Sequence, residues 1–243
     1  MTITEMHQSF RFGMDKLDNL NYPNFRPEEI DLLLNQAQDR FVKQRYGITN
    51  TKRTSFEETQ KRTDDLKELV RSVNVAGNAK ISTNINSNAR FFTLPQDYWF
   101  IIQERVEQHC DKCNDHNINY TDPDSGVVYR NYPVKYAEVR PISHVEFDKV
   151  SLDAFKQPDY YKVLRLMYED KSELICSPLC NVATYKLRYI KKPLTMSLTT
   201  PTNCELSQHT HQEIVDEAIK IALEGIEAKR NNTFTPIIDN QKE

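Results

Sequence analysis

Four of the five cysteines form two close pairs, an arrangement through which proteins often supply thiolates to a zinc ion. The first pair is Cys110 and Cys113, the second is Cys176 and Cys180, and the fifth cysteine is Cys204. The first pair has the two-residue spacing of many zinc ligands, whereas the second is looser and encloses Pro178. Two interpretations stay open: the pairs together bind a structural zinc ion, or they are unrelated free thiols in a reducing compartment. We favour the second interpretation.

Histidines and carboxylates show no catalytic pattern. His209 and His211 are two residues apart and cannot share one helical face, so we expect a solvent-facing helix entrance there and no metal site. Adjacent carboxylates such as Asp64 and Asp65 do not converge on one substrate when they lie on a helix. The sequence contains no nucleophile elbow, phosphate-binding loop or zinc-protease motif. These observations predict that the chain is not an enzyme and holds no cofactor or metal.

Aromatic residues alternate with cations from Tyr185 to Lys192, a pattern that stacks bases and holds phosphates in some single-strand binders. The alternative is an ordinary strand with two different faces, whose charges protect the edge of a sheet, and we favour it. The whole chain has 32 basic and 35 acidic residues, a formal net charge of -3. Because this balance gives no broad positive field, the sequence argues against a dedicated nucleic-acid binder.

Three segments have the apolar spacing of helices. The first runs from Pro27 to Tyr46 and begins with a proline and two acids, which suit the positive end of a helix dipole. The second is predicted from Thr54 to Val73. The third is predicted from Thr210 to Lys229, with Thr210 and Glu213 as a capping box and an apolar arc wide enough to need packing on two sides. The residues that we expect to mediate helix packing and assembly are Ile30, Leu34, Ala37, Phe41, Ile214, Ala218, Ile221 and Ala222.

From Arg90 to Pro193 the apolar period changes from helical to alternating, which is typical of strands with one buried face. A hairpin is expected about Asp170 and Lys171. Ser143 and Glu146 form a capping box, which predicts a short helix between strands. The polar stretches 74–88 and 111–131 are expected to be loops or an extended hairpin.

This order of elements predicts an α+β fold, a helical body from the N- and C-terminal parts of the chain with an inserted β-rich subdomain. The polar first segment is interpreted as an irregular arm that docks on another subunit. The predicted division is 1–26 for the N-terminal arm, 27–89 and 194–230 for the helical body, 90–193 for the β-rich subdomain and 231–243 for the C-terminal tail.

Nothing in the sequence predicts a membrane partner. No apolar run reaches the roughly 18 residues that a membrane helix needs, and the first residues lack the basic and apolar regions of a signal peptide. The odd number of cysteines fits a reducing compartment. We therefore expect synthesis in a cytoplasm.

Three segments in combination resemble a known family. They are the early helix with the residues after it, a strand that ends in Tyr-Ile-x-x-Pro, and a Glu-Leu step followed by a His-x-Glu-Ile-Val helix. These segments lie at Pro27–Gly47, at Leu187–Pro193, and at Cys204–Leu206 with His211–Glu224. The combination resembles head–tail connector (adaptor, ring) proteins of tailed bacteriophages and is most similar to the portal-associated ring proteins of crAss-like phages that infect Bacteroides.

The resemblance implies a structural virion protein, one subunit of a homo-oligomeric ring of twelve copies below the phage portal. Such a ring forms part of the DNA ejection channel and a platform for the next tail component, so the implied partners are the portal and adjacent ring or tail proteins. Viral DNA is expected to pass through the lumen without sequence-specific binding. The chain is then expected at the portal vertex of the virion, and in the host cytoplasm during assembly.

A second function follows from the residues alone. If Cys110, Cys113, Cys176 and Cys180 share a zinc ion, the chain is a cytosolic zinc-stabilised binding module or enzyme.

Overall fold

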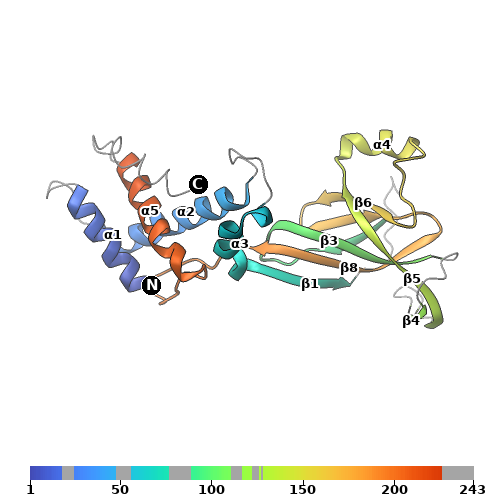
Figure 1. Ribbon diagram of the computed structural model, residues 1–243, viewed down its shortest axis with the longest axis horizontal. Helices are drawn as coiled ribbons and strands as arrows, with labels where there is room; N and C mark the ends of the chain where they lie inside the picture. Colours follow the sequence, from blue (N-terminus) through green and yellow to red (C-terminus); the bar gives the residue numbers. More distant parts are fainter. Residues whose placement is uncertain are drawn as a thin grey trace. The chain divides into compact units, whose positions relative to one another are not determined.

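The chain divides into two compact units. The computed structural model describes residues 1–17, 25–47, 56–76, 89–110, 117–121, 126 and 128–225. Residues Met1–Val70 and Lys192–Glu243 form one unit, called here the helical unit, and Arg71–Lys191 form the other, called the sheet unit (Figure 1). The presence of both helices and a mixed sheet confirms the predicted α+β class. The first boundary falls at Arg71, earlier than the expected residue 90, because a strand already begins there.

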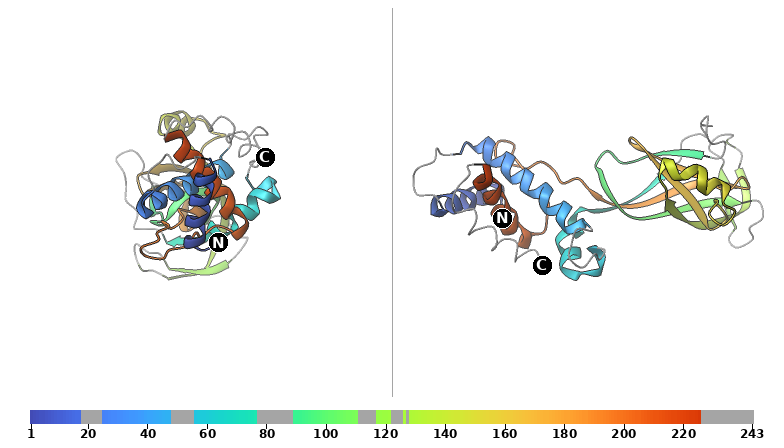
Figure 2. Two further views of the ribbon diagram at one scale, coloured as in Figure 1. Left: turned by 90° about the vertical axis from the view of Figure 1, so that its left-hand side faces the viewer. Right: turned by 90° about the horizontal axis from the view of Figure 1, so that it is seen from above.

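The helical unit is built from helices at both ends of the chain. Its elements are α1 (Ile3–Leu17), α2 (Pro27–Tyr46), the short 3-10 helices η1 (Phe56–Glu58) and η2 (Lys67–Leu69), α3 (Gln60–Leu66), η3 (Gln208–Thr210) and α5 (His211–Gly225). Helix α5 packs against both α1 and α2 (Figure 2). This two-sided packing is what its wide apolar arc requires.

Helix α1 corrects the expectation of an irregular N-terminal arm. Its buried side chains Ile3, Met6, Phe10 and Met14 recur every three or four residues, which is the spacing of one helical face. Because most of the residues between them are polar, the sequence pattern predicts a polar and irregular segment. Residues 18–24, the end of the expected arm, lie outside the described residues.

The predicted helix from Thr54 to Val73 is confirmed only in part, because η1, α3 and η2 cover residues 56–69 as separate short pieces and the last residues form a strand. The α-helical part, α3, ends at Leu66, and strand β1 (Val70–Ala76) starts where the helix was expected to end. The β-branched residues Val73 and Val75 alternate with exposed polar residues and pack against the sheet core. Alternation of this kind favours a strand over a helix. Thr54, where the helix was expected to begin, lies outside the described residues.

The sheet unit is one curled mixed sheet with a helix on its outer face. Its strands run in the order β1-β8-β3-β5-β6-β7-β2, and β4 pairs with β5. The further elements are β2 (Ala89–Thr93), β3 (Tyr98–Cys110), β4 (Asn117–Thr121), β5 (Val128–Pro141), α4 (His144–Leu152), β6 (Lys162–Tyr168), β7 (Lys171–Ile175) and β8 (Cys180–Lys191). Strands β5 and β6 pair in parallel because α4 provides the crossover between them.

Two local predictions in the sheet unit are confirmed. The hairpin expected about Asp170 joins β6 to β7, and Glu169 in its turn has a positive φ of 49°. The side chain of Ser143 accepts a hydrogen bond from the Glu146 amide at the start of α4. None of the helices in the described part of the chain is long and apolar enough to cross a membrane.

Candidate functional site

The residues predicted to mediate helix packing lie where α2 meets α5. On α2, Ile30, Leu34, Ala37 and Phe41 are buried. On α5, Ile214, Ala218 and Ala222 are buried, whereas Ile221 is only partly buried. The two helices are in direct contact. These side chains therefore belong to the core of the helical unit, and their role in assembly between subunits stays a prediction.

A second face of α2 holds the chain segment that follows the sheet unit. The side chain of Asn35 forms two hydrogen bonds with the backbone of Met196. Its Nδ2 donates to the Met196 carbonyl at 2.9 Å, and its Oδ1 accepts from the Met196 amide at 2.8 Å. The Gln38 amide donates to the carbonyl of Leu194 at 3.2 Å. Asp31 accepts the amide of Leu198 at 3.0 Å. Because an extended segment lacks its own hydrogen bonds, these side chains supply them and fix its path.

Asp31 also binds helix α1. The His7 ring lies 2.7 Å from Asp31 through Nε2, and the His7 side chain is almost fully buried. One carboxylate thereby links α1, α2 and the segment before α5.

A buried ion-pair network closes the other end of α2. The Arg45 guanidinium lies 2.8 Å from Asp65 of α3 through Nε and 2.5 Å from Glu213 of α5 through Nη2. Arg45 and Asp65 are 3% and 0% exposed, so neither charge is stabilised by water. Arg45 also lies over the ring of Phe41 at 4.7 Å. Removing one partner of such a buried pair leaves an uncompensated charge, which typically costs about 3–5 kcal/mol.

Glu213 was expected to cap α5 together with Thr210, and that prediction is wrong. Helix α5 begins at His211, and the Thr210 hydroxyl donates to the carbonyl of Ser207 at 2.8 Å. Glu213 pairs with Arg45 instead, and this ion pair joins α5 to α2.

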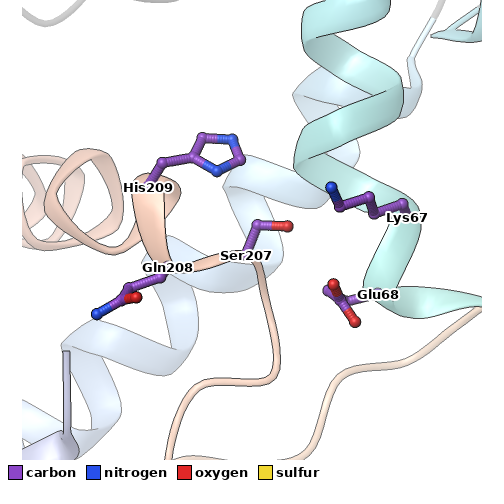
Figure 3. A pocket seen from close by; sticks show the side chains of 5 residues that line it. All are labelled: Lys67, Glu68, Ser207, Gln208 and His209. Atoms are coloured by element: carbon purple, nitrogen blue, oxygen red, sulfur yellow. The ribbon is translucent and has the colours of Figure 1, made fainter.

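A polar hollow of about 540 Å³ lies beside this network. It is lined by Lys67, Glu68, Ser207, Gln208 and His209 (Figure 3). The hollow contains a serine and a histidine, and His209 binds Asp65 through Nε2 at 2.8 Å. These are the three residue types of a nucleophilic triad, so their geometry decides whether the hollow is an active site.

The geometry does not form a nucleophilic site. A catalytic serine must give its proton to the histidine, but the Ser207 hydroxyl donates to the carbonyl of Asp64 at 2.9 Å. Asp65, the third member, is already paired with Arg45. Ser207 and His209 therefore hold η3 against α3, and the hollow offers no activated nucleophile.

His211 corrects the expectation of a solvent-facing helix entrance. It is 5% exposed, and its Nε2 donates to the carbonyl of Leu206 at 2.9 Å. Its Nδ1 lies 2.9 Å from the amino group of Met1. Burial lowers the pKa of His211, opposed by the Leu206 carbonyl and reinforced by the Met1 ammonium. The neutral ring thus joins the start of α5 to the start of α1.

At least one of the four paired cysteines is not available as a thiolate. Cys180 is disulfide-bonded, which removes its sulfur as a zinc ligand and corrects the expectation of unrelated free thiols. In the β3–β8 register Cys180 lies opposite Cys110. Cys176 donates from Sγ to the carbonyl of Cys180 at 3.1 Å. Cys113 lies outside the described residues, and among those that are described no group of three or more histidines, cysteines or carboxylates forms a metal site.

Strand β8 has the two different faces that its sequence predicts, but it does not lie at an edge. It pairs with β1 on one side and β3 on the other, so the expected protection of a sheet edge is wrong. Tyr185 and Tyr189 are both buried; the Tyr185 hydroxyl donates to Glu104 at 2.7 Å, and the Tyr189 hydroxyl donates to Asp97 at 2.9 Å. Burial raises the pKa of Tyr189 to about 12, and it also raises the pKa of Tyr185. Rings held in this way cannot stack on nucleic-acid bases.

Sequence comparison identifies the family to which these features belong. The family described as phage tail ring protein 3/4 matches residues 1–234, which include both units. The chain belongs to this family. As a phage tail ring protein it is a structural component of a virion, which is the coarse function that the resemblance implied.

Two curated relatives come from one virus, Bacteroides phage crAss001. The chain is 22% identical over 243 residues to the protein named Ring protein 4/5, covering 91% of this chain and 92% of that one. It is 26% identical over 217 residues to Ring protein 3, covering 83% and 86%. Both matches extend over most of the helical and sheet units, so the likeness concerns the whole architecture.

Proposed function

We propose that this phage tail ring protein is a subunit of a head–tail connector ring that docks below the portal. Twelve copies surround the DNA ejection channel, and their outer end forms the platform for the next tail component. The observation that carries this proposal is the family match over residues 1–234. The ring-protein names of the two relatives support side-by-side assembly of copies.

The two relatives also support a stack of homologous rings. One phage encodes a Ring protein 3 and a Ring protein 4/5, and this chain matches both over most of its length. Rings that share an architecture can be added one above another through related contacts. We place this chain in one ring of such a stack, with the portal and the adjacent ring proteins as its partners.

The chain acts in this ring as a wall and not as an enzyme. Three polar residues of the helical unit that could belong to a catalytic site make structural contacts instead. Ser207 donates to the carbonyl of Asp64, Asp65 pairs with Arg45, and His211 donates to the carbonyl of Leu206. A net charge of -3 lets duplex DNA slide past without the strong phosphate attraction that a basic wall would exert.

The N-terminal segment takes a different role from the arm that its polarity predicted. Because α1 is packed into the helical unit, it stabilises the subunit itself. Of the two terminal segments, only the C-terminal tail 231–243, which lies outside the described residues, then stays a candidate for contacts with neighbouring copies.

The test is a cryo-EM reconstruction of the tail of the virion that contains this protein, together with quantitative mass spectrometry of purified particles. We expect a continuous ring with twelve copies of the chain next to the portal and a central channel filled by DNA before ejection. Absence of the chain from purified virions would refute the proposal. A ring with another number of copies or another height in the stack would correct those details alone.

A further inference from the structure

The sheet unit has two outer surfaces that point in opposite directions. Phe92 of β2 and Tyr185 of β8 lie five strands apart in the sheet order, yet their rings meet edge to face with centroids 5.6 Å apart. The sheet must therefore curl over a shared core, as its views show (Figures 1 and 2). The outer side of β6–β7–β2 consequently faces away from the outer side of β8–β3–β5.

The first outer surface is formed by residues 144–159, which comprise α4 and the turn after it; we call it the α4 surface. Phe147 and Val150 of α4 pack down on the sheet. Val145 and Leu152 lie on the opposite side of the helix and are 82% and 85% exposed, and Phe155 in the turn is 93% exposed. Large apolar side chains that are this exposed and this close together indicate a binding surface.

The α4 surface is also acidic. Its carboxylates outnumber its lysines four to two: Glu146, Asp148, Asp153 and Asp159 against Lys149 and Lys156. Lys156 pairs with Asp153 at 3.0 Å and Lys162 of β6 lies 3.8 Å from Asp159, so Glu146 and Asp148 account for most of the acidic character of the surface.

The second outer surface is the outward side of β3, β5 and β8; we call it the strand surface. Its outward side chains are Gln103, Arg105, Glu107, Tyr136, Glu138, Arg140, Thr184, Lys186 and Arg188. Cations outnumber carboxylates four to two on this surface. At its centre Tyr136 is 49% exposed, and Arg105 and Lys186 lie 5.6 Å and 5.2 Å from its ring.

We propose that the α4 surface of one copy docks on the strand surface of the next copy in the ring. This inference rests on the proposed ring and names the contact that builds it. The two surfaces have opposite net charge, which orients the encounter and rejects wrong pairings. Val145, Leu152 and Phe155 supply the apolar centre, and Tyr136 is the aromatic ring that they meet.

The arrangement of the two surfaces explains why the occupant is a second copy of this chain. A contact between two different surfaces of the same chain is head to tail, and a series of such contacts closes into a ring when the rotation per copy allows it. Surfaces on opposite sides of one compact unit meet that requirement, because each copy then has one neighbour on either side.

The test is photo-crosslinking in assembled virions. Leu152→p-benzoylphenylalanine puts a crosslinker on the α4 surface at a position where the large exposure of Leu152 tolerates it. Particles are assembled from a mixture of normal and heavy-nitrogen-labelled chains, so that mixed-mass peptide pairs identify contacts between copies. Gln212→p-benzoylphenylalanine, at an exposed position on α5 of the helical unit, is the matched control.

We expect the crosslinker at 152 to capture peptides with residues 103–107, 136–140 or 184–188 of another copy, and the control to capture none of these. In particles that also carry Arg105→Glu and Arg188→Glu, the yield should fall about tenfold, equivalent to ~1.4 kcal/mol. The same charge change at exposed positions of the helical unit, Arg11→Glu with Lys67→Glu, should leave the yield unchanged.

Crosslinks from 152 only to another protein, or only to other parts of this chain, would overturn the inference while the ring itself stands. An undiminished yield in the Arg105→Glu, Arg188→Glu particles would also overturn it, as would an equal loss in the control pair. If the chain is missing from virions, the proposed ring fails and the docking contact fails with it.

Discussion

At the scale of single residues, the His211 ring links the start of α5 to the start of α1. The neutral ring of His211 donates from Nε2 to the Leu206 carbonyl and accepts at Nδ1 from the Met1 amino group. A protonated ring would place a second positive charge beside that ammonium, in a site that is nearly closed to water. The stability of the unit is therefore linked to the charge of one histidine.

The first prediction is that His211 makes the protein less stable in mild acid. Burial lowers its pKa in the folded state below the ordinary value of about 6.5. The unfolded chain then binds more protons as pH falls, so the free energy of unfolding should decrease from about pH 7 downward, until the folded-state pKa is passed. His211→Asn should flatten this part of the pH profile, measured by urea unfolding between pH 7 and 5.

The matched control is His144→Gln. His144 is an exposed residue of α4, and its ring donates a hydrogen bond to the Met167 carbonyl. The control should keep the slope of the original protein. A flat profile in the unmodified chain would contradict the role given to His211.

The second prediction is that Cys204 is unreactive in the folded protein. Burial raises the pKa of its thiol to about 11, and the thiol donates to the Gln38 side-chain oxygen at 3.4 Å. At pH 8 roughly one thiol in a thousand is then ionised, and the thiolate is the reactive form. Peptide mapping after brief iodoacetamide treatment should find Cys204 unlabelled in buffer and fully labelled in guanidinium. Equal labelling in both would mean that the segment before α5 does not pack on α2.

At the scale of elements, α1 is a packed helix that lies very near α5 at Gly13. A β-carbon added there would overlap the terminal Cδ1 of Ile219. Glycine in a helix costs about 1 kcal/mol relative to alanine, so its presence at this position is explained by the tight contact with α5.

The third prediction uses that contact. Gly13→Ala should cost up to about 1 kcal/mol in the helical unit, because the overlapping Cδ1 is the flexible end of Ile219 and can shift, and because alanine itself favours helix. Ile219→Val removes the overlapping Cδ1 and should itself cost about 0.5–1.5 kcal/mol. The double variant should be clearly more stable than the sum of the two costs predicts, as measured by chemical denaturation. Strict additivity would show that α1 and α5 do not meet at this point.

At the scale of the whole molecule, the sheet unit is a continuous insertion into the helical unit. Its first and last residues, Arg71 and Lys191, belong to β1 and β8, which are neighbours in the sheet. Its core combines side chains from β2, β3, β5, β6, β7 and β8 and needs no residue of the helical unit.

The fourth prediction is that residues 71–191 fold when expressed alone. The fragment should show a β-rich circular dichroism spectrum and one cooperative thermal transition. Leu187→Ala, at a core position that is 1% exposed, should lower the free energy of unfolding by about 2–5 kcal/mol. The exposed Leu152→Ala is the control and should change it little. A fragment that is soluble but does not melt cooperatively would show that the two units fold only together.

The sequence by itself determined the elements whose pattern is continuous and local. Helix α2 was predicted with its observed bounds, because its proline start and its apolar stripe from Ile30 to Phe41 depend only on neighbouring residues. The Ser143 cap, the hairpin at Asp170 and the two faces of β8 are local in the same sense. The family resemblance depended on these same segments.

The stripe of α2 also includes a charged residue at a position that is expected to be buried. Arg45 continues the spacing of Ile30, Leu34, Ala37 and Phe41, which puts a charge on a buried face. Such a residue needs a buried partner of opposite charge. The sequence could therefore have indicated an ion pair there, although it does not identify Asp65 and Glu213 as the partners.

Only the tertiary structure decided the features that depend on contacts between distant segments. Helix α1 is stabilised by α5, more than 190 residues later, and an isolated helix of its length is marginal in water. The helical segment ends and β1 begins because Val73 and Val75 pack against the core of the sheet unit. The two opposed outer surfaces of the sheet unit exist only because the sheet curls until β2 meets β8, and no local pattern in the sequence records that curvature.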